Sequence, residues 1–181
     1  MSDHVDRVLA QWALSRPDLD TTGPAVIARM GRVMAYLDVA LNVPLADFGL
    51  TRASWDVLAS LRRGGPPYRL SPTQLYRALM RTSGAMTHRL AGLERKGLVR
   101  RLADSNDGRG LLVELTADGL DLVDRAAPVH LANERQLLAC LTDTEQATLA
   151  ALLRKLLLAF EAEQPVPPNG AGGRRAAHSG P

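Results

Sequence analysis

Six cationic side chains gather in one short segment of the chain, between positions 88 and 109. They are Arg89, Arg95, Lys96, Arg100, Arg101 and Arg109. Three anions oppose them, namely Glu94, Asp104 and Asp107. The segment therefore carries a surplus of +3, which equals the formal net charge of all 181 residues. A local basic patch on a nearly neutral protein indicates a polyanionic partner, and the alternative is a solvated basic face.

Two short helices and a hairpin are predicted to position these cations. Ser71-Pro72-Thr73-Gln74 has the composition of a helix start, with an N-cap serine, a proline at the first position and glutamine three residues after the cap. A second helix begins near Ser83 and ends at Gly97, with Met86, Leu90 and Leu93 as its apolar face. Strands over 98–103 and 111–116 flank a turn-forming segment, 104–108, and the alternation of the second strand places Leu111, Val113 and Leu115 on one face. Residues 68–70 can form a short extended piece before the first helix. This order predicts a winged helix-turn-helix over residues 51–116.

Each part of this motif implies a role on DNA. The first helix braces against the backbone, and the second enters the major groove with small and hydroxyl-bearing residues in its first turns. Arg109 at the hairpin tip is suited to the minor groove, and Asp107 holds it in place. The alternative for that pair is an exposed salt bridge worth at most about 1 kcal/mol. The predicted DNA-binding residues are Ser71, Thr73, Ser83, Gly84, Ala85, Thr87, His88, Arg100, Asp107 and Arg109.

Helices are predicted on both sides of the motif, so the expected class is mainly α with a small β-wing. Residues 1–50 contain a first helix to Ser15 and a long helix that opens at Pro24 and ends at Pro44. Thr51 caps the helix that follows. Residues 117–163 form C-terminal helices, the last of which begins with the capping box of Thr142. Residues 164–181 are rich in Pro, Gly and Ala and are expected to be a disordered tail.

Nothing in the sequence indicates catalysis or a cofactor. The four histidines are scattered without metal-ligand spacing, and there is no phosphate loop or nucleophile elbow. Cys140, the single cysteine, lies in a Leu-rich segment and is expected to be a buried, inert thiol. The N-terminus does not resemble a signal peptide, and no apolar run approaches the roughly 20 residues of a membrane span. We expect a cytoplasmic protein that is not an enzyme and has no membrane partner.

Three motifs in the basic half of the chain resemble the MarR family of bacterial regulators. They are Leu93-Glu94-Arg95-Lys96-Gly97-Leu98-Val99-Arg100-Arg101, Asp107-Gly108-Arg109-Gly110 and Leu115-Thr116-Ala117-Asp118-Gly119. The similarity in order, spacing and helix content covers roughly residues 5–163. It implies a homodimer built from the N- and C-terminal helices, a pseudo-palindromic operator in double-stranded DNA, and release by a small ligand, as in a repressor. The Leu-rich stripe of the last helix independently favours a dimer.

Four further residues resemble the urate-responsive branch of that family, and the resemblance implies that they bind the ligand. They are Trp12, Asp56, Arg89 and Arg101. Their chemistry suits a purine anion, because guanidinium groups donate in a fork, a carboxylate accepts from a ring N–H and an indole stacks. We expect Asp56 and Arg89 to pair in the DNA-competent form, and the ligand to compete for Arg89.

Other interpretations stay open for each of these residues and for the protein. Trp12 alone is explained as an anchor of the first helix, Asp56 as a partner of Arg52, and the two arginines as phosphate contacts. The effector is alternatively another anion, such as a phenolic or tricarboxylic acid. A ligand-independent architectural DNA-binding protein is the remaining alternative.

Overall fold

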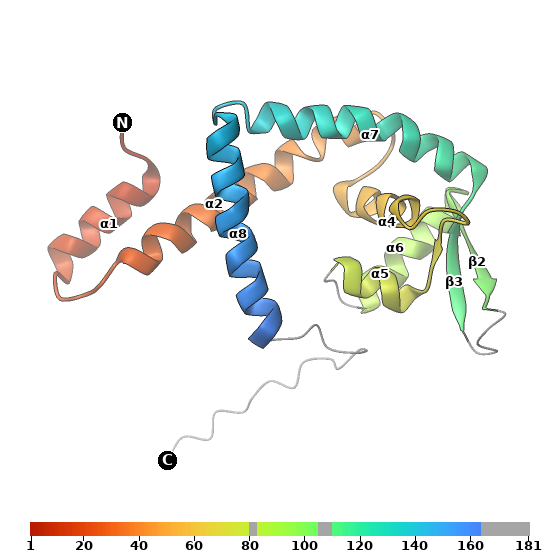
Figure 1. Ribbon diagram of the computed structural model, residues 1–181, viewed down its shortest axis with the longest axis horizontal. Helices are drawn as coiled ribbons and strands as arrows, with labels where there is room; N and C mark the ends of the chain where they lie inside the picture. Colours follow the sequence, from red (N-terminus) through yellow and green to blue (C-terminus); the bar gives the residue numbers. More distant parts are fainter. Residues whose placement is uncertain (80–82, 105–109, 164–181) are drawn as a thin grey trace, which may run out of the picture.

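The structure is a computed structural model of the chain, and it describes residues 1–79, 83–104 and 110–163. Helices dominate these ranges, and their strands form one small antiparallel sheet. In Figure 1 the sheet lies with α4, α5 and α6 at one end of an elongated molecule, and α1 lies at the other end. The predicted class, mainly α with a small β-wing, is therefore confirmed.

Apart from the short α3, which the sequence did not predict, the elements follow the predicted order along the chain. They are α1 (His4–Ser15), α2 (Thr22–Ala40), α3 (Val43–Ala46), α4 (Arg52–Arg63), β1 (Arg69–Leu70), α5 (Pro72–Leu79), α6 (Ser83–Arg95), β2 (Val99–Ala103), β3 (Leu111–Leu115), α7 (Ala117–Leu137) and α8 (Asp143–Glu163). The predicted caps Thr51, Ser71 and Thr142 are confirmed. Each hydroxyl accepts the backbone N–H three residues later, at 3.2, 3.2 and 3.3 Å respectively.

Two local predictions are wrong. Pro44 does not end the long helix, because α2 already ends at Ala40 and Pro44 lies in the first turn of α3, where no N–H is required of it. Cys140 is exposed, not buried. It lies in the turn between α7 and α8, and the neighbouring Leu138 is also 38% exposed because α8 leaves this turn in a new direction.

The core lies where α4, α5, α6 and α7 pack around the sheet. Its largest fully buried side chains are Leu45, Leu58, Leu61, Leu75, Leu93, Val57, Val113 and Val123. Met86 and Leu90 join Leu93 as the buried face of α6, as their helical spacing predicted. This core turns the opposite face of α6 outward.

The sheet has the order β1-β3-β2, with β3 in the centre. The hairpin strands pair in the register Val99↔Leu115 and Arg101↔Val113. The short extended piece predicted before α5 is β1, which pairs with the far edge of β3. The sequence predicted that this piece is extended but not that it completes a three-stranded sheet.

One tight junction joins the end of α6 to the starts of β2 and α7. Gly97 ends α6 with a φ of 71°, and its carbonyl accepts the Thr116 hydroxyl at 2.7 Å. The same hydroxyl accepts the Gly119 N–H at 3.0 Å and so caps α7. A Cβ atom on Gly119 would lie 2.0 Å from the carbonyl oxygen of Leu98, so only glycine permits this approach.

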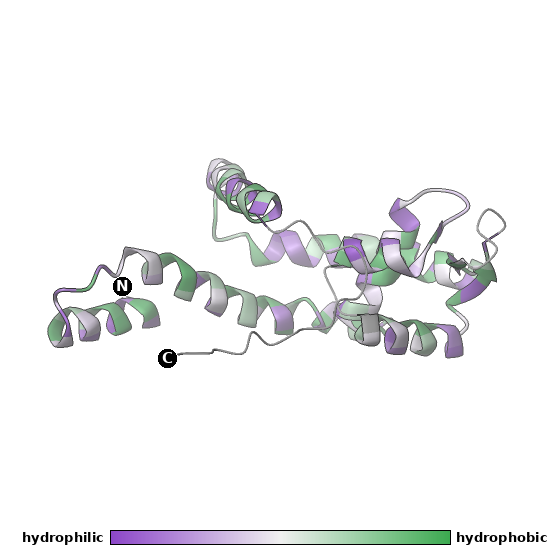
Figure 2. Cartoon of the chain, turned by 90° about the horizontal axis from the view of Figure 1, so that it is seen from below, coloured by the Kyte–Doolittle hydropathy of each residue, from purple (hydrophilic) through white to green (hydrophobic). Residues whose placement is uncertain are grey.

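Helices α2 and α8 contain no buried residue. The stripe predicted on α8 is exposed throughout, from 40 to 58%, at Leu149, Leu152, Leu153, Leu156, Leu157 and Phe160. Figure 2 shows hydrophobic segments along both helices. Among the described residues, no helix has the length and apolar character that a membrane crossing requires.

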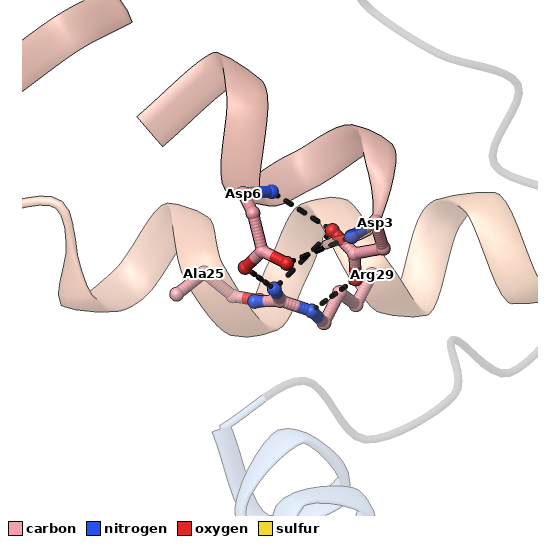
Figure 3. Close-up of polar contacts among 4 residues, drawn as sticks. All are labelled: Asp3, Asp6, Ala25 and Arg29. Carbon is pink, nitrogen blue, oxygen red and sulfur yellow. Dashed lines mark hydrogen bonds and ion pairs between the residues drawn. The ribbon is translucent and has the colours of Figure 1, made fainter. Parts of the chain in front are cut away.

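Helix α1 is fastened to α2 by one arginine. The Arg29 guanidinium pairs with Asp3 at 2.8 Å and with Asp6 at 2.5 Å, and it also donates to the Ala25 carbonyl (Figure 3). Asp3 and Asp6 are also the capping box of α1. The Asp6 N–H, followed by Arg29, holds the pKa of Asp3 below its ordinary 3.8. We call Asp3, Asp6 and Arg29 the α1 clasp.

Gly119→Ala is expected to lower the free energy of unfolding by about 1–3 kcal/mol or more, because the new methyl group overlaps the Leu98 carbonyl. Chemical denaturation measures the change. Gly92→Ala is the matched control, since its Cβ meets nothing within 4 Å and a helical alanine is favoured by up to about 1 kcal/mol. Equal effects of the two substitutions on stability would contradict the close contact between Gly119 and the Leu98 carbonyl.

Docking of α1 is expected to weaken in acid. Because the folded-state pKa of Asp3 is depressed, its stabilising contribution is present above pH 3.8 and is lost as pH falls below that value. The protection factors of the α1 amides, which are exchange rates corrected for the intrinsic pH dependence, should therefore fall below pH 3.8. In Arg29→Ala, exchange should already be faster at neutral pH. Protection of α1 that is unchanged in both conditions would exclude the clasp.

Candidate nucleic-acid interface

Helices α5 and α6 form the two-helix unit of the predicted motif. Ser71 and Gln74 form the capping box of α5, with the Ser71 N–H donating to the Gln74 side chain at 2.7 Å. Leu75 is completely buried and anchors α5 on the core. Because Met86, Leu90 and Leu93 hold α6 by one face, its other face is available to a ligand outside the chain.

The exposed face of α6 carries four of the ten predicted DNA-binding residues. Gly84, Ala85, Thr87 and His88 are all exposed, whereas Ser71 and Thr73 are half-buried at the start of α5. The two small residues leave the first turns of α6 without bulk. The hydroxyl and imidazole offer hydrogen-bonding groups to base edges or phosphates.

Three predicted residues have limited or no structural description. Ser83 is the first residue of α6, as predicted. Asp107 and Arg109, the predicted wing tip, lie outside the described residues. Their roles stay predictions.

Arg100 lies on β2 and belongs to a row of charges across the sheet. Its guanidinium is 3.2 Å from Glu114 Oε1, and Arg69 on β1 is 3.5 Å from Glu114 Oε2. Glu114 is only 8% exposed, although strand alternation predicted an outward side chain there. The sequence did not identify Arg69 or Glu114, because the partner strand of β1 cannot be read from so short a segment.

Arg101 forms an ion pair that joins β2 to α6. Its Nε lies 3.3 Å from Glu94 Oε2 in the last turn of α6, and both side chains are about one-third to two-fifths exposed. The pair joins β2 to α6 across the Gly97 turn. Arg101 therefore has a carboxylate partner that an anionic ligand would have to replace.

Arg89 lines a hollow of about 430 Å³ between the start of α4 and α6. We call it the α4–α6 hollow, and its lining residues are Thr51, Ala53, Ser54, Ala85, His88, Arg89, Gly92, Leu93 and Lys96. Lys96 also donates to the Gly49 carbonyl at 2.8 Å, which ties the end of α6 to the loop before α4. Ala85 and His88 belong to both, so the hollow adjoins the predicted DNA-reading face.

Asp56 lines a different hollow, of about 320 Å³, on the other side of α4. We call it the α4–α7 hollow, and its lining residues include Trp55, Asp56, Arg63, Ala127, His130 and Glu134. Arg52, the alternative partner of Asp56, pairs with Asp38 instead. Within the described ranges, no hydrogen bond or ion pair engages the Asp56 carboxylate.

Trp12 lies on α1, at the end of the molecule opposite to α4 and α6 (Figure 1). It is 45% exposed, so it does not serve mainly as a buried anchor within its own chain. A single chain therefore distributes the four predicted ligand residues over α1, the two hollows and β2. It does not bring them together around one cavity.

The α4–α7 hollow contains a buried histidine that the sequence analysis did not single out. His130 is 5% exposed, its Nε2 lies 3.2 Å from Glu134, and its ring centroid lies 4.9 Å from that of Trp55. Its Nδ1 is buried and has no hydrogen-bond partner in the described part of the chain. The spacing of His130 and Glu134, one helical turn, was the available signal. No metal-binding group of three or more ligands occurs among the described residues.

Comparisons with known proteins identify the family that the chain resembles. A model of the MarR family matches residues 48–110. The transcriptional regulator PecS of Dickeya dadantii is 37% identical over 152 residues, which cover 84% of this chain and 92% of PecS.

Two solved structures resemble the chain along most of their length. A mutant of MarR from Escherichia coli, complexed with operator DNA, has a TM-score of 0.68 and 33% identity, and covers 77% of this chain and 99% of its own. BpsR of Bordetella bronchiseptica, whose DNA binding is regulated by 6-hydroxynicotinic acid, has a TM-score of 0.66 and 25% identity, and covers 72% and 91%.

Proposed function

Because the chain belongs to the MarR family of DNA-binding transcriptional regulators, which are not enzymes, we propose that it is a ligand-responsive homodimeric repressor. It binds a pseudo-palindromic operator and releases it when a small anion binds. The observation that carries the proposal is α6, whose buried face packs on the core while its opposite face exposes Gly84, Ala85, Thr87 and His88.

DNA reading is assigned to residues 51–116. The exposed face of α6 enters the major groove, α5 braces against the backbone, and the wing contacts the adjacent minor groove. Residues 1–50 and 117–163 form the dimerisation arms. The complex of the related E. coli protein with operator DNA supports DNA binding by a chain of this fold.

The dimer is supported by the apolar faces of α2 and α8. Neither helix buries a residue within its own chain, although α8 carries a leucine stripe at helical spacing. An exposed apolar surface of this extent is unusual for a monomer and is typical of an interface. A second copy of the chain presents the same helices, so a symmetric contact covers both sets.

The proposed effector is urate or a related purine. Asp56 has an unpartnered carboxylate that accepts from a ring N–H, and the guanidinium groups of Arg89 and Arg101 suit an anionic ring. Helix α1 reaches far from its own α4, so we propose that Trp12 approaches the ligand across the dimer. The resemblance of Trp12, Asp56, Arg89 and Arg101 to the urate-responsive branch of the family supports this assignment.

Helix α4 is proposed to transmit ligand binding to α6. It separates the two hollows, so a ligand beside Asp56 that displaces α4 also changes the wall that faces Arg89 on α6. Competition with Glu94 for Arg101 would at the same time loosen β2 from α6. This arrangement replaces the direct Asp56–Arg89 pair that we expected from the sequence. The ligand then favours a population with lower DNA affinity.

A different anion is the second candidate. BpsR responds to 6-hydroxynicotinic acid, a hydroxylated heteroaromatic acid, and this supports a wider class of planar anions that includes phenolic acids. A tricarboxylic acid would use the same arginines. A ligand-independent architectural role is the third candidate.

Urate is expected to release the protein from DNA of its own upstream region. Fluorescence anisotropy of that labelled duplex, titrated with urate, xanthine, salicylate and trans-aconitate, measures the release. Release by another compound but not by urate would identify the second candidate. If no compound lowers the affinity, the protein is ligand-independent.

The combination of Trp12→Phe and Asp56→Asn serves as the matched variant in this assay. It should retain DNA affinity and require more urate for half-release, because it removes a stacking surface and a ring N–H acceptor. A wild-type urate response in this variant would remove both residues from the site.

Leu152→Asp with Leu156→Asp is expected to shift the protein from dimer to monomer, because two carboxylates would be buried in the proposed interface. Sedimentation velocity measures the change. Ala151→Asp, on the opposite face of α8 by helical spacing, is the control and should remain dimeric. A double variant that stays dimeric would exclude this face of α8 from the interface.

A further inference from the structure

We propose that Arg69 and Arg100, held side by side by the buried carboxylate of Glu114, form a phosphate-binding pair on the outer face of the sheet. The ligand is the backbone of double-stranded DNA, so the inference rests on the proposed DNA-binding function. It adds Arg69 to the interface as a contact and Glu114 as a positioning residue.

The register of the sheet places the three residues in one straight row. Arg69 on β1 and Arg100 on β2 are both direct partners of Glu114 on the central strand. Adjacent strands lie about 4.8 Å apart, so the two arginine backbones are about 10 Å apart with the carboxylate between them. Val113 and Leu115 point into the core, and the alternation of the strand therefore turns Glu114 to the outer face.

The Glu114 carboxylate contacts both guanidinium groups and leaves other N–H donors of each for an external ligand. Glu114 contacts Arg100 at 3.2 Å and Arg69 at 3.5 Å, and Glu114 Oε2 is buried without a hydrogen-bond partner among the described residues. The side chains of Arg69 and Arg100 remain 39% and 60% exposed. Each guanidinium has five N–H donors, so most of them are left for an external acceptor. Two cations around one anion leave the row with a charge of +1.

Backbone contacts fix Arg69 next to the predicted interface. The Tyr68 carbonyl accepts the Leu115 N–H at 3.1 Å, which pins β1 to β3 immediately before Arg69. Tyr68 has a φ of 58°, and the Arg62 guanidinium lies 5.1 Å from the centroid of its ring. Two residues after Arg69, Ser71 caps α5, the helix assigned to the DNA backbone. The row therefore extends the contact surface of α5 onto the sheet.

The test compares Arg69→Ala and Arg100→Ala with Arg125→Ala. Arg125 is an exposed arginine of α7 that is paired with Asp121 at 2.9 Å, so its removal changes the net charge equally. Binding to a random-sequence 30-base-pair duplex is measured by anisotropy over a series of salt concentrations. A lost phosphate contact lowers the slope of log Kobs against log salt by about 0.9 per protomer. We expect this loss in Arg69→Ala and Arg100→Ala and no change in Arg125→Ala.

The controls separate the possible failures. If the wild-type protein does not bind the duplex, the proposed function fails. If it binds and Arg69→Ala keeps the wild-type slope, the phosphate pair is overturned. Arg69→Lys keeps the charge and should restore the slope, whereas a purely structural role of Arg69 would weaken binding without any change of slope. Thermal denaturation checks that each variant is folded.

Glu114→Gln tests the positioning role by the sign of its effect. A glutamine offers one oxygen instead of two and adds an N–H₂ group that repels one guanidinium, so the pair should lose its geometry and DNA affinity should fall. Removal of a negative charge alone would raise the affinity. Tighter binding by Glu114→Gln would therefore overturn the assignment of Glu114.

Discussion

The approach of Gly119 to the Leu98 carbonyl is the constraint on which the other elements depend. At this point the end of α6, the start of β2 and the start of α7 meet. The Thr116 hydroxyl donates to the Gly97 carbonyl and accepts the Gly119 N–H. The relative orientation of α6, the β2–β3 hairpin and α7 is therefore set at one place. A side chain on Gly119 would separate all three together.

Carboxylates hold the arginines of this end of the molecule in defined positions. Glu94 holds Arg101, Glu114 holds both Arg69 and Arg100, and Asp124 holds Arg62. The exposed pairs, Glu94–Arg101 and Asp124–Arg62, contribute little to stability. Their effect is geometric, because a guanidinium with one fixed partner has fewer orientations to lose when it meets an anion.

The sequence predicted those parts of the fold that depend on local chemistry. The capping residues Thr51, Ser71 and Thr142 and the spacing of Met86, Leu90 and Leu93 each report on hydrogen bonds or faces within a few residues. The pairing of β1, the burial of Glu114 and the hollow around His130 depend on residues far apart in the chain, and no local pattern reports them. The distribution of Trp12, Asp56 and Arg89 over separate elements was missed for the same reason.

The absence of buried residues in α2 and α8 has a consequence for how DNA binding depends on the amount of protein in the cell. If their apolar faces are covered only by a second copy, the folded, DNA-competent species forms by a second-order reaction, and its stability depends on protein concentration. At low expression its amount would rise with the square of the chain concentration. Occupancy of an operator would then respond to synthesis as a threshold, before any effector is present.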